Sequence, residues 1–250
     1  MAIGSALLFV GALPFVAVPS GVVWSWLLGS VALHTVYKLL LIKAYGVGDF
    51  GQVYPIARGS APLMITVAMA MLFAEQLSLI ATAGIATLVL GVLLMSVRGG
   101  RNANRMQLVA VGYALSTSVF IAAYMVVDGM GARASTELVG SATSYAFWLF
   151  FLDGLAMLCV LLASRGLGGL RQLQPYWRTA LAGSAMSSAA YWIVIWAMTV
   201  APIGLVAAIR ETSVLFAALI SIVFLREPFT RWRLISACLI VVGVALTRFT

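Results

Sequence analysis

The chain has 250 residues, of which 63% are hydrophobic and only 9% are charged. Soluble domains contain about 45–50% apolar and about 25% charged residues. The composition therefore excludes a water-soluble domain and, more firmly, a disordered chain. Apolar stretches of about 20 residues also exclude a β-barrel, whose strands alternate apolar and polar side chains. The sequence predicts an all-α membrane protein.

Nine apolar stretches are long enough to be spans at about 20 residues each. In chain order they are residues 3–19, 22–45, 52–73, 77–97, 107–128, 140–163, 178–199, 203–225 and 233–249. The connections between them are short, which is typical of one compact bundle. We expect a polytopic helical bundle of about nine transmembrane helices, placed as a multi-pass protein in the cell (inner) membrane.

The net charge of +8 is interpreted as loop lysine and arginine, which set the orientation of membrane proteins, and no nucleic-acid partner is expected. The expected partners are a small-molecule substrate, the lipid bilayer and a second copy of the chain in a homodimer. Cys159, Cys238 and the single histidine are far apart in sequence, so no metal site is expected. Gly46–Gly51 matches G-x-G-x-x-G between two apolar stretches, without the strand of a dinucleotide site, and no cofactor is expected.

The sequence repeats itself when it is shifted by 152 residues. Arg58 then meets Arg210, Glu75 meets Glu227 and Gly91 meets Gly243, with no gap between residues 58 and 94. The shift predicts a first repeat at 1–100 with four helices and a second at 106–250 with five. Because an odd number of helices separates equivalent helices, the repeats should be inverted. Inverted repeats are a common build of secondary transporters.

Two segments resemble the EamA-type repeat of the drug/metabolite transporter superfamily. Residues 54–94 carry Glu75 followed by Gly91-Val92, and residues 205–246 carry Glu227 followed by Gly243-Val244. The chain departs from the family pattern where Ala74 and Arg226 replace a common glycine. The resemblance implies a secondary carrier of small metabolites, often an exporter, with ten helices in two sets of five. This chain would lack the first of them.

Function is interpreted accordingly as export of a small metabolite or amphipathic compound by alternating access. A flippase for a lipid-linked headgroup and a non-transporting membrane subunit are the alternatives. No nucleophile, general base or metal cluster has a recognisable spacing, so no enzyme and no catalytic residue is expected.

Charged residues inside apolar stretches are the first candidates for a site, since a charge at a helix centre costs about 2.5–3.5 kcal/mol. Arg58 and Arg210 are interpreted as an anion-attracting pair in a cavity, on opposite sides of the membrane midplane. Alternatively they extend to the interface or pair with Glu211 or Asp153. Pro62 removes the helical hydrogen bond to the carbonyl of Arg58 and predicts a kink there.

Further candidates follow from helical spacing. Asp153, the acid expected deepest in a span, and Glu211 are candidates for ion coupling. His34, Tyr37 and Lys38 share one helix face, and Tyr191 and Trp192 occupy the equivalent face of the second repeat, which indicates a cavity lining or aromatic packing. A structural role in turns or helix packing is expected for Glu75, Glu227, Gly91 and Gly243.

Arginines gather in every second loop, near residues 100, 170 and 230. The positive-inside rule places these loops in the cytoplasm, so residue 1 should be inside and residue 250 outside. A reporter enzyme that is active only outside the cytoplasm should therefore be active when it is fused after Thr250. A fusion that is active only in the cytoplasm would contradict this orientation.

Overall fold

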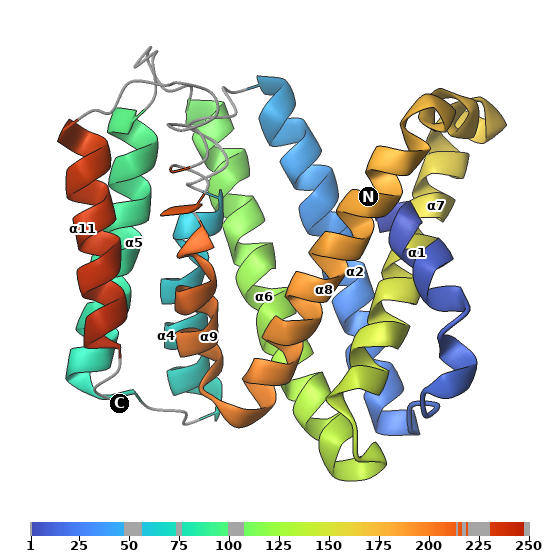
Figure 1. Ribbon diagram of the computed structural model, residues 1–250, viewed down its shortest axis with the longest axis horizontal. Coiled ribbons are helices and arrows are strands. Elements are labelled where there is room, and N and C mark those ends of the chain that lie inside the picture. The colour runs from blue at the N-terminus through green and yellow to red at the C-terminus, as the bar shows by residue number, and fades with distance from the viewer. Residues whose placement is uncertain are drawn as a thin grey trace. The chain divides into compact units, whose positions relative to one another are not determined.

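The structure, a computed structural model, describes residues 2–47, 57–73, 77–99, 108–213, 215–216, 219 and 231–247 (Figure 1). These ranges hold helices and short connections and no strand. The α-helices are α1 (Ala2–Val10), α2 (Gly21–Val47), α4 (Ala61–Phe73), α5 (Leu79–Gly99), α6 (Leu108–Val139), α7 (Ala142–Leu173), α8 (Trp177–Val200), α9 (Ile203–Arg210) and α11 (Arg231–Leu246). The predicted all-α, polytopic fold class is confirmed.

Four segments in the described part of the chain are long and apolar enough to cross a membrane. They are Gly21–Gly46, Val111–Val139, Ala142–Leu170 and Gln174–Val200, of 26 to 29 residues each. Shorter apolar helices cover Ala57–Phe73, Leu79–Leu94 and Leu234–Leu246. A helix of 26 residues is about 39 Å long at 1.5 Å per residue, which exceeds the hydrocarbon thickness of about 30 Å.

Several predicted spans have other bounds in the structure. The first does not reach residue 19, because α1 ends at Val10 and a short 3-10 turn follows at Leu13–Phe15, where Pro14 cannot donate a helical hydrogen bond. The fifth does not end at residue 128, since α6 continues to Val139. The eighth is interrupted after Arg210 by a turn at residues 211–212. The last two differences decide where the functional side chains lie.

The chain divides into two compact units. Unit 1 comprises Met1–Thr35 and Val127–Val200, and unit 2 comprises Val36–Val126 and Ala201–Thr250. Each unit takes helices from both predicted repeats. The chain passes from one unit to the other inside α2, again inside α6 and a third time between α8 and α9.

In unit 1, α1 packs against α7 and α8. A glycine allows the close approach to α7, since a Cβ added at Gly154 would lie 2.6 Å from the Cβ of Ala6. The ring of Phe9 in α1 lies 4.8 Å from that of Phe147 and 5.0 Å from that of Phe150, both in α7. Small residues and aromatic contacts together keep α1 against α7.

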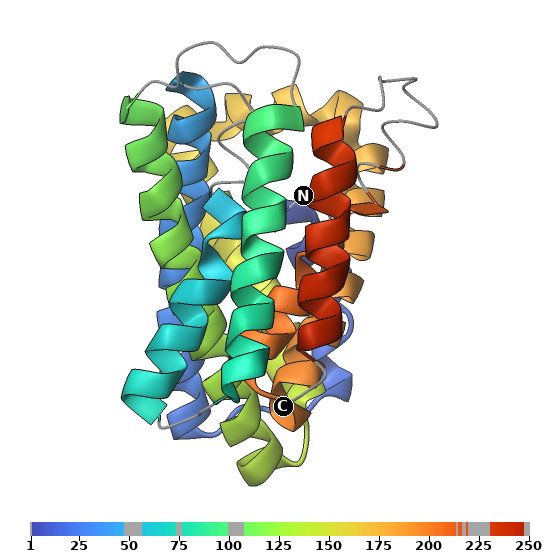
Figure 2. The ribbon, with the colours of Figure 1, turned by 90° about the vertical axis from the view of Figure 1, so that its left-hand side faces the viewer.

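In unit 2, α5 and α11 lie side by side and run antiparallel (Figure 2). A Cβ at Gly84 would lie 2.8 Å from the carbonyl oxygen of Gly243, and one at Gly91 would lie 2.9 Å from the carbonyl oxygen of Ser236. The backbones are therefore in contact. Such close packing through small residues is a main source of helix association in lipid, where apolar side chains gain little by leaving the bilayer.

The contact between α5 and α11 is reciprocal under the repeat. The shift of 152 residues pairs Gly84 with Ser236 and Gly91 with Gly243. The contact from Gly84 to Gly243 therefore becomes the contact from Ser236 to Gly91, which the structure also contains. A reciprocal contact of this kind is the mark of a two-fold relation. Between antiparallel helices it is the packing that inverted repeats require.

Gly84→Ala should lower the thermal unfolding midpoint in detergent. The new Cβ would meet the backbone of α11, which cannot rotate away, and overpacking costs about 1–3 kcal/mol. Gly112→Ala in α6 is the matched control, because no atom lies within 4 Å of its added Cβ. Equal midpoints for the two variants would contradict the close α5–α11 contact.

Candidate functional site

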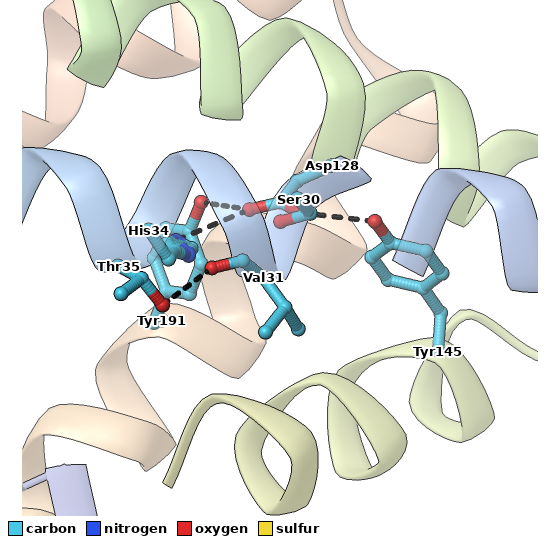
Figure 3. A network of polar contacts seen from close by, with 7 residues as sticks. All are labelled: Ser30, Val31, His34, Thr35, Asp128, Tyr145 and Tyr191. Atoms are coloured by element: carbon cyan, nitrogen blue, oxygen red, sulfur yellow. Dashed lines mark hydrogen bonds and ion pairs between the residues drawn. The ribbon is translucent and has the colours of Figure 1, made fainter. Parts of the chain in front are cut away.

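A buried carboxylate lies inside unit 1 (Figure 3). Asp128 of α6 has none of its surface exposed. Its Oδ1 accepts hydrogen bonds from the hydroxyl of Ser30 and, at 3.0 Å, from that of Tyr145. Its Oδ2 accepts a hydrogen bond of 2.6 Å from the hydroxyl of Tyr191. One carboxylate thus joins α6 to α2, α7 and α8.

His34 completes this group. Its Nε2 lies 3.6 Å from Oδ2 of Asp128, and its ring meets that of Tyr191 edge-on at 5.9 Å. The distance of 3.6 Å is too long for a hydrogen bond and close enough for an ion pair when the imidazole is protonated. We call Ser30, His34, Asp128, Tyr145 and Tyr191 the Asp128 cluster.

Local sequence positions the Asp128 cluster. Ser30 and His34 are four residues apart on α2, so they lie on one helix face. Gly131 follows Asp128 by three residues, and a Cβ there would lie 2.7 Å from Cζ of Tyr145. Only a glycine leaves room for the tyrosine ring beside the carboxylate. The ring of Tyr145 is itself fully buried, so its hydroxyl is directed at Asp128.

Sequence reasoning missed Asp128 and favoured Asp153 as the deepest acid. Asp153 is partly exposed on α7, whereas Asp128 is completely buried within the protein. The cause is the boundary of α6, which was expected to end at residue 128. Instead, α6 continues past Asp128 to Val139. The signal that could have identified Asp128 is its position as an acidic residue within an apolar stretch that continues beyond residue 128.

A second charged group lies in unit 2. The Oε1 atom of Glu211 lies 3.6 Å from Nη2 of Arg58 and 3.6 Å from Nε of Arg210. The side chain of Glu211 is 3% exposed, that of Arg210 15% and that of Arg58 28%. We call these three residues the arginine cluster. Two guanidinium groups and one carboxylate leave it with a net charge of +1.

Both arginines lie beside a helix break. The helical turn at 57–59 ends at Ser60 before α4, and α9 ends at Arg210 before the turn at 211–212. The shift of 152 residues pairs Ser60 with Thr212, so the two repeats break at the same position. Pro62, which predicted a kink, is the second residue of α4. At the break, the hydroxyl of Ser60 lies 2.7 Å from that of Ser118 in α6.

Close packing of α4 on α9 brings the two breaks together. A Cβ at Gly204 of α9 would lie 3.2 Å from Cα of Thr66 in α4. The hydroxyl of Thr66, which donates to the carbonyl of Pro62, faces Gly204, and the missing side chain of the glycine leaves room for it. Arg58 and Arg210 converge on one carboxylate oxygen, which is the pairing with Glu211 that was expected from the sequence as an alternative.

The other candidate residues lie outside these clusters. The ring of Tyr37 lies 5.0 Å from that of Tyr124, and Nζ of Lys38 lies 5.8 Å from the Tyr37 ring. Trp192 donates from Nε1 to the hydroxyl of Thr143 at 3.2 Å. These contacts place Tyr37 and Lys38 among aromatic side chains of unit 2, and Trp192 on α8 in unit 1.

The residues expected to be structural divide into two pairs. Gly91 and Gly243 lie in the contact between α5 and α11. Glu75 and Glu227 lie outside the described residues.

Comparison with known proteins identifies the family. The model of the EamA-like transporter family matches residues 108–249, more than half of the chain. The chain belongs to the EamA-like transporter family. No curated protein matches it. A solved structure described as "Crystal structure of protein" has a TM-score of 0.73 and 19% sequence identity over 99% of this chain and 88% of its own, a likeness of fold.

Members of the EamA-like family are membrane transporters, and this protein is one of them. The matched residues run from α6 to α11. They include Asp128 with its tyrosine partners, and Arg210 with Glu211. Ser30, His34 and Arg58, which complete the two clusters, come from the segment before the match. Each cluster therefore combines residues from both predicted repeats of this EamA-like transporter.

Asp128→Leu should strongly destabilise the EamA-like transporter. Three hydroxyl groups would lose their acceptor, two of them on the buried residues Ser30 and Tyr145, and each unsatisfied buried group costs about 1–3 kcal/mol. Thermal unfolding in detergent measures the loss. Asp153→Leu is the matched control and should change the midpoint much less, because that carboxylate is partly exposed. A larger loss in the control would contradict the role assigned to Asp128.

Proposed function

We propose that this EamA-like protein is a secondary transporter that exports a small metabolite or amphipathic compound across the cytoplasmic membrane by alternating access. The arginine cluster carries the proposal. Two helices that are equivalent in the repeat break at the same position and bring Arg58 and Arg210 onto one carboxylate. Broken helices that meet at a charged group are the usual construction of a substrate site in transporters with inverted repeats.

The charge of the arginine cluster favours a solute with an anionic group. Guanidinium groups match carboxylates and phosphates in geometry and charge. Glu211 forms ion pairs with both arginines. At 3.6 Å these contacts are longer than good hydrogen bonds. The solute's anionic group would compete with Glu211 for the two arginines. Both arginine side chains are partly exposed, which supports such an exchange.

The two compact units support alternating access. Transporters of this kind move one helical body against another around the substrate site. The units of this chain are connected inside α2, inside α6 and between α8 and α9, and one unit would move against the other at these three passages. The sequence has no G-x-x-x-x-G-K-[ST] motif, which favours a solute or proton gradient over ATP as the energy source.

Flux measurements in liposomes test the proposal. The panel contains small carboxylates, amino acids, phosphorylated metabolites and amphipathic carboxylates, each in radiolabelled form. Arg58→Gln and Arg210→Gln should each reduce transport of the anionic solutes about tenfold or more, because a charged hydrogen bond contributes about 1.5–3 kcal/mol. Arg178→Gln is the matched control, since that exposed arginine packs on Trp177.

Three outcomes would contradict the proposal. The first is that the wild-type protein moves no member of the panel. The second is that Arg58→Gln and Arg178→Gln transport equally well. The third is that the wild-type protein moves a fluorescent phospholipid between the leaflets and none of the soluble solutes, which would favour a flippase.

A further inference from the structure

The Asp128 cluster is a second polar site, separate in residues from the arginine cluster. We propose that Asp128 binds and releases a proton during the transport cycle and thereby couples solute movement to the proton gradient. This inference rests on the proposed function, because it assigns the coupling ion of the same transporter. It assigns coupling to Asp128 in place of Asp153 and Glu211, which the sequence had favoured.

The chemistry of its partners suits Asp128 to two protonation states. Ser30, Tyr145 and Tyr191 contact it through hydroxyl groups, and a hydroxyl can both donate and accept a hydrogen bond. When the carboxylate is charged, all three donate to it. When it is protonated, one hydroxyl can turn and accept from the new O–H group. The site therefore has a hydrogen-bonded arrangement in both states.

Glu211 has no such freedom toward the arginines beside it. Guanidinium groups donate and cannot accept, so Arg58 and Arg210 offer Glu211 donors and no acceptor. The two clusters therefore differ in chemistry as well as in position. The arginine cluster suits an exchange of anions, whereas the Asp128 cluster suits an exchange of protons.

Proton binding to Asp128 changes one bond and one charge. One proton from the aqueous phase forms an O–H bond with the carboxylate of Asp128, no other covalent bond changes, and the charge of the cluster rises by one. The group then needs one acceptor where it previously accepted from three donors. Protonation therefore weakens the hydrogen bonds that join α6 to Ser30 of α2, Tyr145 of α7 and Tyr191 of α8.

The position of the Asp128 cluster links this weakening to movement. Unit 1 ends in α2 at Thr35, one residue after His34, and resumes in α6 at Val127, one residue before Asp128. The hydrogen bonds of the cluster thus hold α2 and α6 together within unit 1, next to the points where both helices pass into unit 2. Releasing these bonds would free both helices to bend there.

The charged neighbours of Asp128 come from each helix around it. His34 approaches from α2 with Nε2 at 3.6 Å, and the charge of Asp153 acts on it from α7. Tyr145 and Tyr191 are the titratable groups in direct contact from α7 and α8. Arg133, further along α6, donates from Nε to the carbonyl of Met198 at 2.9 Å.

Infrared spectroscopy of the full chain in detergent tests proton binding without any solute. We expect a carbonyl band of a protonated carboxyl group that appears as the pH is lowered from mildly alkaline to mildly acidic. It should be lost in Asp128→Asn and kept in the matched control Asp153→Asn. Tyr191→Phe, which removes one hydroxyl and no ring, should shift the frequency of the band. A band that survives in Asp128→Asn, or no band in the wild-type protein, would overturn the proposal.

Transport of the solute found in the liposome panel provides the second readout. In wild-type liposomes a pH gradient should drive solute accumulation, and a trapped pH-sensitive dye should report the accompanying proton flux. Asp128→Asn should keep downhill exchange and lose both effects, whereas Asp153→Asn should keep all three. An unchanged pH response in Asp128→Asn would refute the coupling role while leaving the proposed transport intact. If Asp128→Asn does not fold, Tyr191→Phe provides the test. A carbonyl band with the same frequency in Tyr191→Phe as in the wild-type protein would then refute proton binding at Asp128.

Discussion

A carboxylate enclosed by apolar helices is the interaction on which unit 1 depends. Removing a charge from water is costly unless hydrogen bonds replace the lost solvent. Asp128 meets this condition with three hydroxyl donors from three different helices. Because each donor must reach the same two oxygen atoms, the carboxylate also determines the positions of α2, α7 and α8 relative to α6. A polar centre of this kind specifies one packing among several that apolar surfaces alone would permit.

Unit 2 is held together by a different constraint. Its helices approach until their backbones touch, as Gly84 and Gly91 do against α11. In lipid, where apolar side chains gain little from leaving the solvent, such van der Waals contact is a main source of helix association. The same close packing, between α4 and α9, brings two arginines to one glutamate. Backbone contact through small residues thus determines the location of the charged site.

Each of the two clusters contains one carboxylate, but the groups around that carboxylate differ. Glu211 lies between guanidinium groups, which can only donate, whereas Asp128 lies among hydroxyl groups, which can donate or accept. The first arrangement offers donors to which an anionic solute can bind in place of Glu211. The second accommodates a change of protonation. A secondary transporter needs both a solute site and a coupling step, and the two proposals assign one to each unit.

The composition and the repeat were sufficient to predict the class of the protein. Long apolar stretches require helices in a bilayer, since no other local structure satisfies the backbone there. The matching positions of Arg58 and Arg210, and of Gly91 and Gly243, were visible as a constant shift of 152 residues. The kink before Pro62 followed from the missing amide hydrogen of proline. These features are local or periodic, and therefore they can be read along the chain.

The partners of each side chain could not be read in the same way. Asp128 and Tyr191 are 63 residues apart, and Ser30 and Asp128 are 98 apart; no periodicity links residues across such separations. The length of α6 mattered equally, because Asp128 was expected at the end of its span but lies inside a helix that continues to Val139. Which acid is buried, and which arginines share a carboxylate, depends on how helices from both repeats pack within each unit. That packing arises from contacts between distant segments, on which local patterns have no influence.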